Sequence, residues 1–180
     1  REKYKIYLST LFELVGEPAE KASKDAESVL ALETQLASSM LSKEDRRNPT
    51  LQYNPKTLAE LSKLTPSFNW GGYFTTLAIK EDTIIATEPA FLKEYEKVVN
   101  KYSLEEIKTY LKAALLRGAA PFLNHEFVQA SFDFNTKYMR GTDKMRPRWK
   151  RVLDVTDEFL GEPIGRLYVD ENFPPEAKQK

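Results

Sequence analysis

The feature that most constrains this 180-residue chain is the spacing of its apolar residues. Along almost the whole length they recur three and four positions apart, which is the period of one face of an α-helix. The first such face consists of Tyr4, Tyr7, Leu8, Leu11, Phe12 and Val15. Gly16 and Pro18 then interrupt it, because glycine suits the left-handed residue that ends a helix and proline suits the first turn of the next. The spacing predicts a helical fold.

Similar signals divide the rest of the chain. A second helix is predicted to about Leu41, with an inner side formed by Ala22, Ala26, Val29, Leu30, Leu36, Ala37 and Met40. Two capping boxes, Thr57 with Glu60 and Ser103 with Glu106, predict further helix starts. Residues 42–56 contain two Asn-Pro steps and predict an irregular connection, and residues 83–87 (TIIAT) form the one convincing strand.

Three more apolar faces follow in the second half of the chain. Pro89 starts a helix whose inward residues are Phe91, Tyr95, Val98 and Val99. The helix opened by Ser103 is predicted to end near residues 118–121 and to turn inward Leu104, Ile107, Leu111, Ala114 and Leu115. Asn124 caps a helix through Tyr138, which Gly141 ends. We therefore predict an all-α or nearly all-α single domain of about seven to nine helices, with at most one short strand pair.

Residues 146–173 (RPRWKRVLDVTDEFLGEPIGRLYVDENF) predict two short helices separated by Gly161 and Pro163. Their apolar faces are formed by Trp149, Val152, Leu153, Phe159 and Leu160, and then by Ile164, Leu167 and Tyr168. One interpretation of the basic residues around Trp149 is a site that grips a phosphate backbone and stacks a base. The structural interpretation, which we favour, places Trp149 in the core because it is in register with Val152 and Leu153.

Charge and composition argue against several classes of function. The 27 basic and 27 acidic residues cancel, whereas a protein that neutralises nucleic-acid phosphates normally shows a basic excess. There is no cysteine, and His125 is the only histidine, so a histidine zinc site or a Ser-His-Asp arrangement lacks its residues. No stretch approaches the ~20 apolar residues of a membrane span. We predict no catalytic, cofactor-binding or metal-binding residue in this chain.

Glu33 interrupts the apolar face of the second predicted helix. It is either an edge residue whose carboxylate reaches water, or a buried carboxylate paired with Arg46, Arg47 or Arg148. A Glu33→Gln variant with an unchanged melting temperature would eliminate the second interpretation.

Short motifs spread along nearly the whole chain carry a family resemblance. They are Leu32-Glu33 within ALETQLA, DRRNP at 45–49, Tyr53-Asn54 before TLAEL at 57–61, FNW at 68–70, PRWKR at 147–151, Leu160-Gly161, and GRLYV at 165–169 with Phe173. In this order and spacing, the chain resembles the neprilysin family of zinc metalloendopeptidases, which includes neprilysin, endothelin-converting enzyme and bacterial endopeptidase O.

The resemblance implies that residues 1–180 are the smaller, mostly helical domain that covers the active site in that family. The zinc-binding HExxH helix, the ExxxD glutamate and the NAYx motif lie in the other domain of the family, and none occurs in this chain. No catalytic or metal residue is therefore carried over to any position, and zinc is implied only for the parent enzyme. The cysteines of the animal members are missing, which implies a bacterial, extracytoplasmic (periplasmic or secreted) relative.

The leading hypothesis is a lid domain that admits peptides of limited size to a zinc catalytic domain of the same polypeptide. Both ends look cut, since the chain opens inside a helical pattern and ends on PPEAKQK, a helix start. We therefore expect a truncated domain with an exposed apolar face and a dimer through that face. The alternatives are a helical protein-interaction module unrelated to peptidases and, as the weakest, a nucleic-acid binder through residues 146–151.

Overall fold

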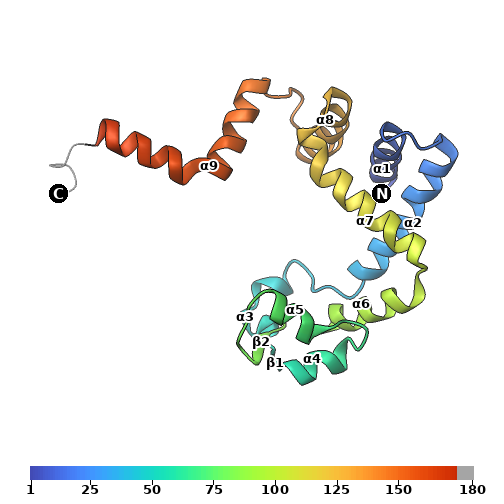
Figure 1. Cartoon of the computed structure of the whole chain (residues 1–180). Coiled ribbons are helices and arrows are strands. Elements are labelled where there is room, and N and C mark those ends of the chain that lie inside the picture. The colour runs from blue at the N-terminus through green and yellow to red at the C-terminus, as the bar shows by residue number, and fades with distance from the viewer. Residues whose placement is uncertain (174–180) are drawn as a thin grey trace. The chain divides into compact units, whose positions relative to one another are not determined.

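The computed structural model describes residues 1–173 and divides the chain into two compact units, Arg1–Asn135 and Thr136–Lys180. We call them the N-terminal and C-terminal units. Within the described residues there are nine α-helices, three short 3₁₀ or π segments and one two-stranded sheet (Figure 1). The predicted nearly all-α fold with one strand pair is confirmed. The helix start predicted at PPEAKQK lies outside the described residues.

The chain opens with α1 (Glu2–Leu14) and α2 (Ala19–Ala37), which pack against each other. Gly16, between them, has the predicted left-handed conformation with φ +90°. Pro18 precedes the first turn of α2 instead of lying in it. The buried residues of α2 are Ala22, Ala26, Val29, Leu32 and Leu36. The predicted inner side was wrong at its end, because α2 stops at Ala37 and leaves Ala37 and Met40 exposed.

The connection predicted as irregular contains short regular elements, η1 (Asp45–Arg47), α3 (Pro49–Gln52) and β1 (Pro55–Thr57). β1 pairs antiparallel with β2 (Thr83–Ile85). Between the strands lie α4 (Leu58–Leu64) and α5 (Trp70–Thr76). The first capping box is present: Thr57 Oγ1 accepts from the Glu60 amide at 3.2 Å, and Glu60 Oε2 accepts from the Thr57 amide at 2.8 Å.

The second half of the N-terminal unit contains α6 (Pro89–Lys101), α7 (Leu104–Ala119), η2 (Ala120–Phe122), α8 (His125–Ser131) and the π-helix η3 (Phe132–Tyr138), which extends past Asn135. The second capping box, of Ser103 and Glu106, opens α7. Asn124 Oδ1 accepts from the Phe127 amide at 3.4 Å and caps α8, as predicted. These local starts follow from side chains that satisfy the free amides of a first helical turn.

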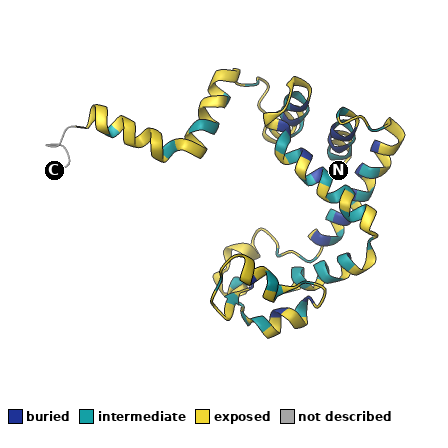
Figure 2. Ribbon diagram, in the orientation of Figure 1, coloured by how far each residue is buried: buried dark blue, intermediate teal, exposed yellow. Residues whose placement is uncertain are grey.

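Three groups of buried side chains stabilise the N-terminal unit. The largest lies among α1, α2, α7, η2 and α8 (Figure 2) and comprises Tyr7, Leu8, Leu11, Phe12, Ala22, Ala26, Val29, Ala113, Leu116, Ala120 and Phe127. The others are Leu32, Leu36 and Val98, and Leu61, Phe74 and Ala86. Each large apolar side chain buried in this way contributes roughly 1.5–3 kcal/mol. Because α1 supplies four members of the largest group, it is the centre of this unit.

The C-terminal unit is dominated by α9 (Arg148–Asn172). Its helical geometry breaks at Leu160, where φ is −127° and ψ is 15°. The two predicted helices are therefore present, but they are joined at a kink instead of separated by a stop at Gly161. None of the α9 residues, all of which the structure describes, is buried (Figure 2). Within residues 1–173, no helix combines the length and the apolar character that crossing a membrane would require.

Candidate functional site

Trp149, the centre of the basic segment 146–151, is 63% exposed. The prediction that it is buried is wrong within this chain, although its helical register with Val152 and Leu153 is correct. Those two neighbours are exposed as well. Within the described part of the C-terminal unit, no residue of α9 is buried.

Three of the four cations around Trp149 are engaged locally. Lys150 Nζ lies 5.2 Å from the centre of the Trp149 ring. Arg146 pairs with Asp154, and Arg151 Nε donates to the carbonyl oxygen of Arg146 at 3.2 Å. With a formal net charge of zero for the whole chain, this arrangement is typical of a helix start and does not favour a phosphate-binding groove.

α9 carries exposed apolar side chains on both sides of its kink at Leu160, and we call these residues together the α9 stripe. Its members are Trp149, Val152, Leu153, Phe159, Leu160, Ile164, Leu167 and Tyr168, each at least 41% exposed. Isolated exposed apolar residues are ordinary, but contiguous apolar surface on one helix face marks a site of interaction. The α9 stripe can bind another apolar surface, and it contains no group that performs chemistry.

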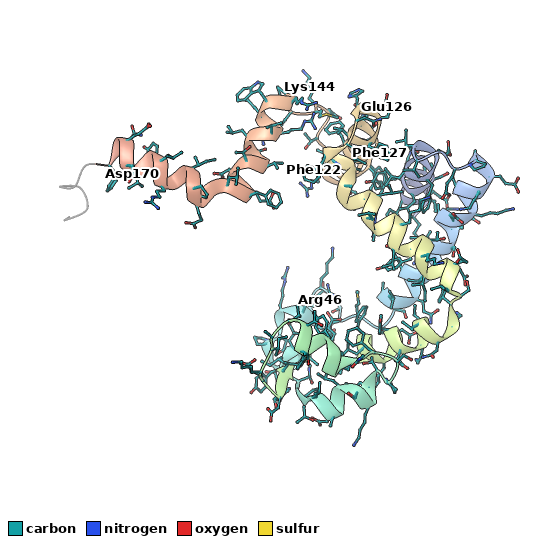
Figure 3. The ribbon with its side chains drawn as sticks, viewed as in Figure 1. Arg46, Phe122, Glu126, Phe127, Lys144 and Asp170 are labelled. Atoms are coloured by element: carbon teal, nitrogen blue, oxygen red, sulfur yellow. The ribbon has the colours of Figure 1, made fainter. Side chains whose placement is uncertain are left out.

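α7 carries apolar residues on two opposite faces. Its buried residues are Ala113 and Leu116, whereas Leu104, Leu111 and Leu115 are 66%, 57% and 71% exposed. We call these three leucines the outer face of α7. They belong to the face that the sequence predicted to be inward, so that prediction is wrong for these three leucines. The buried face is instead the one that carries Ala113 and Leu116. Beyond α7, Phe122 at the end of η2 is also exposed (Figure 3).

Glu33 is half-buried and paired with an arginine, but not with one of the predicted partners. Its Oε1 lies 3.0 Å from Nη1 of Arg117, and its Oε2 accepts a hydrogen bond from the Tyr4 hydroxyl at 2.7 Å. Burial raises the pKa of Tyr4, and the hydrogen bond to Glu33 raises it further. The cluster ties α1, α2 and α7 together, which gives Glu33 a structural role.

The three predicted arginine partners lie elsewhere. Arg46 Nε contacts Glu88 at 2.9 Å, Arg47 belongs to η1, and Arg148 begins α9. Sequence reasoning missed Arg117 because it follows Glu33 by more than eighty positions, and only the packing of α7 against α2 brings the two together. The only feature in the sequence that could have indicated Arg117 is its place as the basic residue in the last turn of α7.

The described residues do not fit a zinc ion. His125 is exposed at the first position of α8. Within residues 1–173, no group of three or more His, Cys, Asp or Glu side chains could hold a metal. We therefore assign no step of a metal-dependent reaction to this part of the chain.

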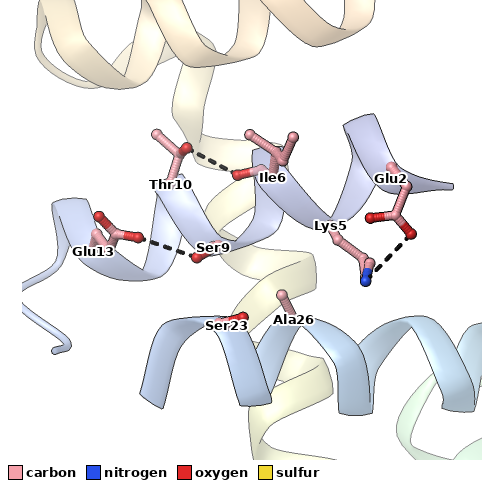
Figure 4. Close-up of a pocket in the computed structure, with 8 residues that line it drawn as sticks. All are labelled: Glu2, Lys5, Ile6, Ser9, Thr10, Glu13, Ser23 and Ala26. Atoms are coloured by element: carbon pink, nitrogen blue, oxygen red, sulfur yellow. Dashed lines mark hydrogen bonds and ion pairs between the residues drawn. The ribbon is translucent and has the colours of Figure 1, made fainter. Parts of the chain in front are cut away.

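A shallow pocket of about 240 Å³ lies between α1 and α2 (Figure 4). Its polar side chains interact with one another: Ser9 Oγ donates to Glu13 Oε1 at 3.1 Å, and Lys5 Nζ lies 3.3 Å from Glu2 Oε1. Such self-satisfied i,i+3 and i,i+4 pairs are typical of the solvated face of a helix. This pocket therefore offers no distinctive chemistry.

A second pocket of about 450 Å³, which we call the α1–α7 pocket, is lined by Tyr4, Tyr7, Ala114, Arg117, Gly118, Phe134 and Asn135. Its walls are aromatic, since the Tyr7 and Phe134 rings stack with centres 5.0 Å apart. The Tyr7 hydroxyl is buried and has no hydrogen-bond partner in the described part of the chain. Buried hydroxyls nearly always have one, so Tyr7 is an exception among the described residues.

Known proteins resemble the chain over its whole length. A family model described as Peptidase family M13 matches residues 1–180. Endothelin-converting enzyme 1 of Mus musculus is 29% identical over 97% of this chain and 24% of that protein. Neutral endopeptidase of Lactobacillus helveticus is 27% identical over 93% of this chain and 26% of that protein.

Solved structures agree with these relatives. The cryo-EM structure of the Mycobacterium tuberculosis zinc metalloprotease Zmp1 in its open state superimposes with a TM-score of 0.90 and 29% identity, over 99% of this chain and 28% of that chain. The inhibitor complex of the same protease gives a TM-score of 0.85 at 28% identity. The chain thus spans about a quarter of the length of the relatives that it matches.

Proposed function

Because the chain belongs to peptidase family M13, we propose that it is the helical lid of a zinc metalloendopeptidase and contributes no catalytic residue. The observation that carries the proposal is the α9 stripe, eight exposed apolar side chains on a helix without a buried residue. A stripe of this kind needs a covering surface. Relatives about four times as long have enough further chain to supply one.

The partner of the lid is the zinc catalytic domain of the same polypeptide. Covering the α9 stripe would contribute roughly 1.5–3 kcal/mol for each large side chain that becomes fully buried. Zinc in that domain would polarise the peptide carbonyl and activate a water molecule. The lid would enclose the space around the zinc site and admit only peptides of limited size. Its residues would therefore control which peptides reach the site.

The same proposal places the parent enzyme outside the cytoplasm, in the periplasm or secreted from a bacterium. The support is the resemblance of the motifs at residues 45–49, 147–151 and 165–169 to the neprilysin family. Fractionation of the producing cells, with immunodetection of the parent, tests this location. Recovery with the cytosolic fraction would contradict it.

Metal content and peptidase activity test the assignment of chemistry. The purified 180-residue chain should contain no stoichiometric zinc and cleave no peptide, whereas the parent should bind one zinc ion per polypeptide and be active. Tight one-to-one zinc together with peptidase activity in the isolated chain would overturn the proposal. Inactivity of the zinc-loaded parent would instead favour a helical interaction module unrelated to peptidases.

Substrate size tests the lid itself. In the parent, replacing Leu153 and Leu167 of the α9 stripe with aspartate should loosen the cover. The value of kcat/KM for long peptides should then rise relative to that for short peptides. Glu158→Lys, an exposed change on the opposite face of α9, is the matched control and should leave the ratio unchanged. An unaltered ratio in the double variant would remove the size-limiting role.

A further inference from the structure

The α1–α7 pocket lies wholly within the N-terminal unit. All of its lining residues belong to Arg1–Asn135, so its shape does not depend on the position of the C-terminal unit. Its volume of about 450 Å³ falls in the range of roughly 300–1,000 Å³ that is typical of sites for small molecules. The pocket is therefore large enough for one aromatic ring with a substituent.

Three aromatic rings and two small residues give the pocket an apolar surface. The Phe134 ring stacks on Tyr7 with the ring centres 5.0 Å apart, and its centre lies 5.5 Å from that of Tyr4. Ala114 and Gly118 are four positions apart on α7 and therefore lie on one face of it. Because neither has a side chain larger than a methyl group, this part of the wall leaves room beside the rings. An aromatic ring suits such a surface, since rings pack on one another at centre distances of about 4.5–7 Å.

Arg117 is the polar residue of this wall that can bind a ligand. Its Nη1 is occupied, because it lies 3.0 Å from Glu33 Oε1 and also donates to the Tyr4 hydroxyl. Within residues 1–173, no group accepts a hydrogen bond from its Nε or Nη2. The Arg117 side chain is 31% exposed, so these two nitrogens remain available to an acceptor in the pocket.

The charges around Arg117 decide which acceptor fits. The Glu33 carboxylate already neutralises the guanidinium group, at 3.0 Å from Nη1. A second carboxylate bound to Arg117 would lie close to Glu33 and be repelled by it. A neutral carbonyl oxygen accepts a hydrogen bond from Nε or Nη2 without this repulsion. The pocket therefore favours a neutral acceptor over an anion.

We propose that the α1–α7 pocket binds a small, neutral aromatic amide. The ring of the ligand lies among Tyr4, Tyr7 and Phe134, and its carbonyl oxygen accepts a hydrogen bond from Arg117. Two sources share this chemistry, namely a free aromatic amide and a phenylalanine residue within a peptide. The site uses only groups of the N-terminal unit, so the proposal does not depend on the lid role.

NMR titration of the ¹⁵N-labelled 180-residue chain with benzamide tests the proposal. The backbone amides of Ala114, Gly118 and Asn135 should shift and reach saturation at millimolar benzamide. Benzoate should bind several-fold more weakly because Glu33 repels it, and acetamide, which has the carbonyl group without the ring, should cause no saturable shift. Shifts that spread over the whole chain without saturation would overturn the proposal, and so would tighter binding of benzoate than of benzamide.

Gly118→Leu fills the pocket and is compatible with the helix. A Cβ at Gly118 meets no atom within 4 Å, and leucine is more favourable than glycine within a helix, so the melting temperature should not fall. Benzamide binding should be lost. Ser23→Leu, an exposed change in the polar α1–α2 pocket, is the matched control and should leave benzamide binding unchanged. Binding that survives Gly118→Leu would contradict the assignment to this pocket.

N-acetylphenylalaninamide distinguishes the two sources of the ligand. Tighter binding than that of benzamide would identify a residue of a peptide, whereas weaker binding would identify a free aromatic amide. Failure of both compounds to bind would overturn the proposal. Zinc content and peptide cleavage test the lid role separately and do not depend on these titrations.

Discussion

The two units of this chain use the same helical period with opposite results. In Arg1–Asn135, amphipathic helices bury their apolar faces against one another in three groups of side chains. In the described part of Thr136–Lys180, an equally amphipathic helix leaves every residue at least partly exposed. The difference teaches that apolar periodicity predicts a helix and its apolar face, but does not identify which segment covers that face.

α7 shows both situations in one helix. Its Ala113 face is buried by neighbours within the N-terminal unit, whereas its leucine face is exposed. The exposed face carries three leucines, whereas the buried residues are Ala113 and Leu116, so apolar side chains of similar size lie on both faces. Burial therefore differs between the two faces of one helix, and the effect of a substitution can be measured on each face separately.

The largest expected effect compares core and stripe directly in the isolated chain. Phe12→Ala removes a fully buried ring from the main core and should lower the free energy of unfolding by about 3–5 kcal/mol. Leu153→Ala in the α9 stripe should change it by less than about 0.5 kcal/mol. Urea denaturation followed by circular dichroism measures both, and equal losses would break the distinction between the two units.

A smaller effect on the free energy of unfolding is expected from Glu33, a charged residue that is half-buried. Glu33→Gln weakens the interactions with Arg117 and Tyr4, both part-buried, and should lower the free energy of unfolding by about 1–3 kcal/mol. Glu20→Gln at an exposed position of α2 is the control, because its partner Lys24 is also exposed. Equal melting temperatures for Glu33→Gln and the unsubstituted chain would rule out a structural role for this carboxylate.

The same cluster predicts a pH dependence at alkaline pH. Burial and then the Glu33 hydrogen bond raise the folded-state pKa of Tyr4 above its ordinary value of 10.0. The unfolded chain therefore loses this proton first, and the stabilisation present below pH 10 declines as the pH rises beyond it. Tyr4→Phe should flatten this part of the stability profile from pH 9 to 11. A fall of the same steepness in the variant would assign the effect to other groups.

Introducing charged residues into the α9 stripe should have the smallest effect on the free energy of unfolding. It should nevertheless have a clear effect on self-association. Leu153→Lys with Leu167→Lys should change the free energy of unfolding by less than about 0.5 kcal/mol. Light scattering should show that the unsubstituted chain dimerises as its concentration rises and that the double variant remains monomeric. A monomeric unsubstituted chain at high concentration would remove self-association through this surface.

The parts of the fold that could be predicted from sequence depend on local chemistry. Gly16 has the left-handed conformation expected at a helix end, and Thr57, Ser103 and Asn124 cap the helices that follow them. The strand at residues 83–87 was found from its β-branched residues, but its partner β1 was not, because Pro55 and the short extended segment give almost no strand signal. Local rules identify where elements begin and end.

The parts that could not be predicted depend on which faces meet. Trp149 was placed inward by its register, although the described residues of its own unit do not bury it. For α7, both faces are apolar, and periodicity cannot tell which one meets α1 and α2. The partner of Glu33 required the packing of α2 against α7, which brings Arg117 to it. Within residues 1–173, no group of three or more His, Cys, Asp or Glu side chains could hold a metal ion.

The central claim is that the α9 stripe is exposed in this chain and covered in its parent. Hydroxyl-radical footprinting with mass spectrometry tests it most directly, by comparing oxidation of Trp149, Phe159 and Tyr168 in the two proteins, with buried Phe12 and exposed Ile6 as references. The account predicts strong oxidation of the three stripe residues in the isolated chain and protection in the parent, with Phe12 protected and Ile6 oxidised in both. Equal oxidation of the stripe in the two proteins would contradict it.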